Sequence, residues 1–212
     1  MRKTPFTLTL ILVLSMLLNV SSFAVYENGP QNTEYNRTNA QSYIGMYTTS
    51  PNSAYHYFTY PAEGGDCTNF ASQVVRAGGM SMTAAVDNPG DSSWYYYGSS
   101  WGRGRSSSWT SATKFRTYWA DVNGVGEKNA YQFRVYLASD FNDDDTWYDI
   151  WSYLEPGDIV QYVRTNDWAT YHSQAVHRTS YENEEYKVSM GQHTSDTVSY
   201  THLRAHETCA DL

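Results

Sequence analysis

Hydrophobic residues recur at helical spacing shortly before position 50. Four of them fall on one face: Ala40, Tyr43, Ile44 and Tyr47. Asn36 and Thr38 lie just in front of this face, and either side chain can accept a hydrogen bond from a first helical turn. The spacing therefore predicts an amphipathic helix through Tyr47 that packs one face against a core.

A second helical pattern follows the segment Gly64-Gly65-Asp66. Apolar residues at helical spacing run from Phe70 to Val75, and Gly78-Gly79 supplies a stop signal. With Asp66 as N-cap, the pattern predicts a helix of about three turns that carries Cys67 in its first turn. The helix dipole and the unpaired N–H groups there favour a thiolate, as a nucleophile requires. A buried core residue or half of a disulfide is the alternative interpretation of Cys67.

The middle of the chain, residues 81–108, shows no sustained period and is rich in glycine, serine and aromatic residues. Long irregular loops in a compact domain are commonly functional. Trp94 and Trp101 can therefore wall a substrate cleft, although rings that simply cover the core would give the same pattern. A further helix is predicted from Ser108-Trp109-Thr110 to about Asn123-Gly124.

Strand patterns dominate the second half of the chain. A short strand is predicted at residues 131–137, followed by an acidic turn at 140–145 that caps a short helix and lacks the glycine and distal glutamate of a calcium loop. Three strands with tight connections come next, at 159–163, 171–178 and 186–190. Helices first and an antiparallel meander afterwards predict the α+β fold class.

The first 24 residues have the pattern of an export signal. Arg2 and Lys3 precede an apolar run from Phe6 to Val20, and Ser22-Phe23-Ala24 places small residues at the cleavage site. A membrane anchor is the alternative, but the run is short for a span and no basic stop follows. We therefore predict a signal peptide at 1–24, a linker at 25–34 and a secreted or wall-associated protein without a membrane anchor after cleavage.

Composition narrows the range of partners. The net charge of −8 becomes −10 when Arg2 and Lys3 leave with the signal, because 12 basic residues then face 22 acidic ones. This balance argues against nucleic acid as a partner. The two cysteines give no disulfide framework, and no histidine, cysteine or aspartate cluster has zinc spacing. We expect a monomer that needs no metal and no cofactor.

A cysteine at a helix start and a histidine on a later strand are the basic parts of a thiol hydrolase. His172 is the best candidate for the base, because it begins a strand directly after a loop. His177 lies five residues on and faces the other way on a regular strand. Gln192 or His193, which follow the next strand, can orient the His172 ring.

The order of several short motifs resembles a known family. These motifs are Gly64–Gln73 around the cysteine, Ser106–Trp109, Pro156–Asp158, His172-Ser173 and Gln192–Thr194. They resemble the putative amidase domain of secreted and sporulating Gram-positive bacteria, a family grouped with the papain-like cysteine hydrolases beside the NlpC/P60 and CHAP cell-wall enzymes. The resemblance covers about residues 35–197.

The resemblance implies a papain-like fold whose nucleophile-bearing helix packs on a C-terminal antiparallel sheet. It implies Cys67 as nucleophile and His172 as base, with His193 as the first choice and Gln192 as the second for the orienting residue. The reaction would be hydrolysis of an amide bond through a thioester, with peptidoglycan or peptide as substrate. The Cys67 N–H and a second donor, for which Tyr60 is a candidate, would bind the oxyanion.

The end of the chain departs from this resemblance. Residues 198–212 lack the pattern of a further strand and look like translated linker sequence, so we predict a non-native tail that includes Cys209. A different class of function also fits the aromatic composition, namely a non-catalytic domain that binds cell wall or glycan and carries an inert cysteine. Alkylation of Cys67 against pH separates these two hypotheses.

Overall fold

The computed structural model describes residues 24–26, 35–60, 62–120, 129–130, 133–136, 143–164 and 166–193. Its elements, in chain order, are β1 (Ala24–Tyr26), α2 (Arg37–Tyr47), α3 (Cys67–Ala77), α4 (Ser107–Thr110), α5 (Ala112–Trp119), β2 (Phe133–Val135), α6 (Asp144–Tyr153), β3 (Ile159–Val163), β4 (Thr170–Glu182) and β5 (Glu185–Gly191). Helices and an antiparallel sheet occupy successive parts of the chain, which confirms the α+β class.

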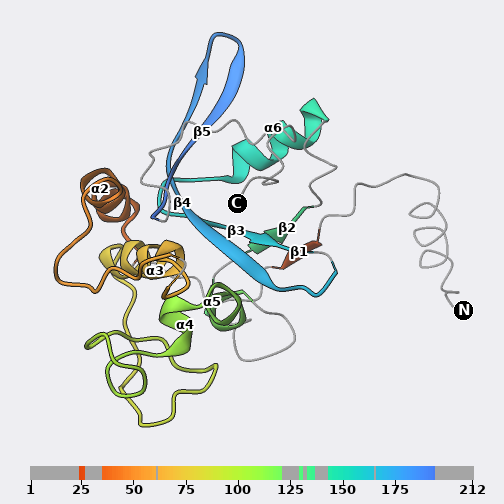
Figure 1. Ribbon diagram of the computed structural model, residues 1–212. Coiled ribbons are helices and arrows are strands. Elements are labelled where there is room, and N and C mark those ends of the chain that lie inside the picture. Colours follow the sequence, from red (N-terminus) through yellow and green to blue (C-terminus); the bar gives the residue numbers. More distant parts are fainter. Residues whose placement is uncertain are drawn as a thin grey trace, which may run out of the picture.

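The three-stranded sheet has the order β3-β4-β5 with antiparallel neighbours, so the predicted meander is confirmed. β4 is longer than expected and forms a long hairpin with β5 that extends past the helices (Figure 1). Asn183 and Glu184 connect these strands with φ angles of 56° and 63°. Such left-handed pairs match the twist of two-residue hairpins.

Both faces of the sheet are covered by helices. Successive residues of β4 point to opposite sides of the sheet, so each packs against a different set of helices. Ala175 packs with residues of α2 and α3, and the next residue, Val176, packs with α6. Figure 1 shows α2, α3 and α5 gathered at one side of the sheet and α6 beside β5. The helix that begins with Cys67 is therefore fixed against the strand that carries His172.

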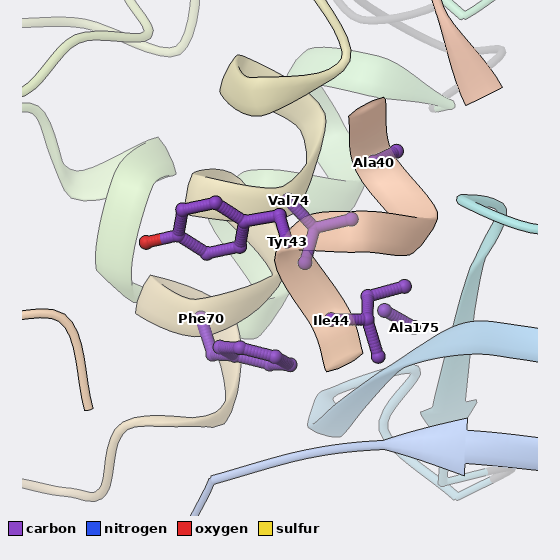
Figure 2. Close-up of a cluster of buried hydrophobic side chains, with 6 residues drawn as sticks. All are labelled: Ala40, Tyr43, Ile44, Phe70, Val74 and Ala175. Carbon is purple, nitrogen blue, oxygen red and sulfur yellow. The ribbon is translucent and has the colours of Figure 1, made fainter. Parts of the chain in front are cut away.

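The core between α2, α3 and the sheet consists of six buried side chains: Ala40, Tyr43, Ile44, Phe70, Val74 and Ala175 (Figure 2). They combine the apolar faces that the helical spacing predicted for both helices. In α3 every residue from Cys67 to Val75 is buried, so its polar residues must find partners inside the protein. The buried polar residues concerned include Asn69, Ser72 and Gln73.

Several boundaries differ from the predictions. Asn36, one of the two candidate caps, accepts a hydrogen bond from Asn39 N–H at 3.0 Å. The helix expected from residue 108 is broken at Ser111, whose extended backbone separates α4 from α5. Val25 and Tyr26 fall in the predicted linker, yet they pair with β2.

Three predictions lie outside the described residues. They are the end near 123–124 of the helix predicted from residue 108, most of the signal peptide, and the tail at 198–212. The part of the chain that is described contains no helix long and apolar enough to cross a membrane.

Candidate active site

Cys67 is the first residue of α3, as the pattern predicts, but Asp66 does not cap the helix with its side chain. The Asp66 carboxylate instead accepts hydrogen bonds from Phe58 N–H at 2.9 Å and from the Asn69 amide at 2.8 Å. Its other oxygen lies 2.5 Å from His193 Nδ1. Asp66 thus joins the segment before the helix to the Asn69 side chain and to His193, and the expected hydrogen bond to a backbone N–H of the first turn is corrected.

The residues after Cys67 anchor the helix to its surroundings. Asn69 Oδ1 accepts the indole N–H of Trp109 at 2.8 Å, and the Ser72 hydroxyl donates to the Trp109 carbonyl at 2.9 Å. Thr68 and Ser173 share a hydrogen bond of 3.1 Å between their hydroxyls, which ties the helix start to β4. The cysteine motif at Gly64–Gln73 and the Ser106–Trp109 motif therefore pack against each other.

His172 on β4 is close enough to the Cys67 thiol for each to shift the pKa of the other. Its Nε2 lies 2.5 Å from Oε1 of Gln192, which follows β5. Gln174 Nε2 also donates to this oxygen, at 2.5 Å. An amide oxygen only accepts, so His172 Nε2 carries a hydrogen and Nδ1 is left for the thiol.

The electrostatics of the pair favour transfer of the proton from the Cys67 thiol to the His172 ring. Burial raises the pKa of the Cys67 thiol, but His172, the Ser173 backbone and the Thr68 hydroxyl together outweigh burial and lower this pKa below that of an ordinary thiol. Burial lowers the pKa of His172, but the bonds to Cys67 and Gln192 together raise it above its usual value. Both shifts favour a thiolate–imidazolium pair over the neutral thiol and imidazole.

His193, the first choice for the orienting residue, does not contact His172. It is almost fully buried, with Nδ1 against the Asp66 carboxyl and Nε2 donating to the Tyr47 carbonyl at 2.7 Å. Both ring nitrogens are thus occupied, and Gln192 takes the place beside His172. Neighbouring residues at the end of an extended strand point to opposite sides, which explains why only one of the two reaches the base.

A cleft of about 360 Å³ has Cys67 among its lining residues. It is lined by the segment before α3, by the start of α5 and by the start of β4, and its charged lining residues are Glu63 and Arg105. This volume lies within the usual range for small-ligand sites. Cys67 therefore borders a cleft that is large enough for a small ligand.

None of the three expected substrate-binding aromatic residues lines this cleft. Trp94 is fully buried and packs on Trp109, so it belongs to the core and the expectation for it is corrected. Trp101 and Tyr60 are 56% and 65% exposed, respectively, and lie outside the lining. The absence of a period in residues 81–108 gave no means of telling buried rings from exposed ones.

Sequence reasoning missed the charged residues of the cleft. Arg105 stands directly before the Ser106–Trp109 motif, which is the one signal that could have drawn attention to it. Glu63 precedes the glycine pair of the cysteine motif in the same way. Among the described residues, no three histidine, cysteine or acidic side chains gather in a manner that could hold a metal ion.

Comparison with known proteins assigns the family. The putative amidase domain matches residues 34–209, most of the chain, and the protein belongs to this family. Membership indicates an enzyme that hydrolyses amide bonds. The matched range includes part of the segment predicted as a non-native tail. No curated protein and no solved structure matches the chain significantly.

Proposed function

We propose that this protein is a secreted cysteine amidase that cleaves amide bonds of cell-wall peptides through a thioester. The observation that carries the proposal is the contact between Cys67 and His172, with Gln192 behind the ring, at the edge of a cleft. A nucleophile, a base and an amide that fixes the tautomer are the parts that papain-like hydrolases use. This arrangement, together with the α+β order, supports a papain-like relationship.

The chemistry follows from these contacts. The Cys67 thiolate attacks the carbonyl carbon, and the tetrahedral oxyanion forms near the start of α3, where the Cys67 N–H has no partner within the helix. The His172 imidazolium gives its proton to the leaving nitrogen as the C–N bond breaks, which leaves a thioester and a free amine. Water then attacks the thioester while neutral His172 takes its proton, and the carboxylic acid and the thiol are released.

Cell-wall peptide is the proposed substrate because the export pattern would bring the enzyme to the wall. The glycan-binding alternative has some support, since Tyr97, Trp101 and Trp168 are exposed aromatic residues. A binding domain does not require a thiol with a lowered pKa beside an opening. The two functions therefore predict different behaviour of Cys67.

The test is the rate of Cys67 alkylation by iodoacetamide against pH. We expect alkylation of the native protein to begin well below the pH at which a free thiol reacts, and His172→Ala to move the curve upward. A Cys67→Ala variant shows which signal comes from this residue. Release of new amines from purified peptidoglycan fragments, measured by mass spectrometry, then identifies the bond. An ordinary free-thiol curve in both proteins would refute the enzyme.

A further inference from the structure

Arg105 lines the cleft of Cys67 and is not fully paired. Its Nε and Nη1 atoms are buried, and neither makes a hydrogen bond within the described part of the chain. Arg134 also has an unpaired buried Nε, but its guanidinium contacts Asp149, as that of Arg37 contacts Asp158 and that of Arg103 contacts Asp87. A buried donor without an acceptor costs about 1–3 kcal/mol, so this side chain is held at a free-energy cost.

The position of Arg105 is fixed by its neighbours. Its guanidinium carbon lies 4.8 Å from the centre of the buried Phe58 ring, a cation–π distance. Phe58 N–H in turn donates to Asp66, the residue before Cys67. The cation is therefore held on the same framework as the nucleophile, rather than extending freely into water as most surface arginines do.

The nearest anionic candidate in the cleft does not satisfy Arg105. Glu63 also lines the cleft, but its carboxylate accepts from the backbone and the hydroxyl of Thr59, both at 3.0 Å, and lies 2.9 Å from His56 Nε2. Among the described residues, none supplies the partner that Arg105 lacks, and the cleft leaves room for one from a bound ligand. The positive charge of the guanidinium matches the negative charge of a carboxylate.

We propose that Arg105 binds a carboxylate of the substrate, so that the enzyme prefers acidic peptides with a free carboxylate near the scissile amide. The proposal rests on the proposed function and adds the class of substrate to it. Because the whole protein carries a net charge of −8, its overall field does not attract such a ligand. Selectivity then depends on this local contact.

The experiment measures how well small acids protect Cys67 from iodoacetamide. N-acetylalanine and its amide, N-acetylalaninamide, differ in the carboxylate and share the rest of the molecule. We expect the acid to protect at concentrations at least about tenfold lower than the amide, as a charged hydrogen-bonded pair implies. Arg105→Gln should remove this difference. Arg103→Gln, which changes a nearby exposed arginine, should retain it.

Two further measurements separate the possible failures. The rate of unprotected alkylation in Arg105→Gln shows whether the site is intact. If the glutamine variant does not fold, Arg105→Lys takes its place, because lysine keeps the charge but lacks the planar guanidinium. Equal protection by acid and amide in the native protein would overturn the proposal. So would a preference for the acid that survives in both Arg105 variants. Because the native pH profile with iodoacetamide alone tests the thiolate, the proposed function can stand when this inference fails.

Discussion

Replacing Gln192 by alanine tests how the base is held. Gln192 Oε1 is the acceptor for His172 Nε2, and the glutamine side chain is only 8% exposed. Bulk water therefore has little room to replace the lost acceptor. The His172 ring would keep its contact with the thiol but lose the group that fixes its orientation and tautomer.

The magnitude follows from the kind of bond that is lost. A hydrogen bond to a charged group contributes about 1.5–3 kcal/mol, and the imidazolium is the charged partner here. If this free energy is lost mainly in the transition state, kcat/KM should fall about 10- to 100-fold. The hydrogen bond to the Gln192 side-chain amide also helps to raise the pKa of His172. Without it, the pKa falls and the imidazolium is lost at a lower pH.

The direction of the pH effect is then fixed. The lowered pKa of Cys67 and the raised pKa of His172 both favour the ion pair. The imidazolium is lost as the pH rises through the pKa of His172. Gln192→Ala should therefore move the alkaline limb of the activity profile to lower pH. Hydrolysis of peptidoglycan fragments and alkylation by iodoacetamide, both followed against pH, measure this shift.

Gln192→Glu supplies the matched comparison, because a carboxylate also accepts from Nε2 and should restore part of the rate. The reasoning would be refuted if Gln192→Ala kept kcat/KM within about twofold of the native value with the same alkaline limb, a difference of less than about 0.5 kcal/mol. A large loss of activity in a folded His193→Ala protein with no effect at Gln192 would point to the other residue as the orienting group.

Three other substitutions test the assigned burial of side chains. His193→Ala removes a partner of the buried Asp66 and should lower the free energy of unfolding by about 3–5 kcal/mol, measured by urea denaturation; a loss below about 1 kcal/mol would contradict the buried pair. Trp94→Ala should cost about 3–5 kcal/mol, because the ring is fully buried. Trp101→Ala should change stability by less than about 0.5 kcal/mol, and similar losses at both tryptophans would contradict the assigned burial.

Local patterns were sufficient for the elements that carry the site. Helical spacing with glycine stops predicted α3 with Cys67 at its start, and alternation with turn residues predicted the meander that carries His172. Both follow from interactions between residues close in sequence, which periodicity records directly. The family resemblance rested on motifs in these same elements, and the match to residues 34–209 confirms that family.

The tertiary structure decided every question that depends on which side a residue faces. Gln192 and His193 are adjacent, and only the packing of β4 and β5 against α3 determines which one meets His172 and which one meets Asp66. Residues 81–108 carry no period, so the burial of Trp94 was not encoded in a local pattern. Arg105 reaches the cleft for the same reason: contacts between distant segments place it over Phe58, and those contacts exist only once the chain has folded.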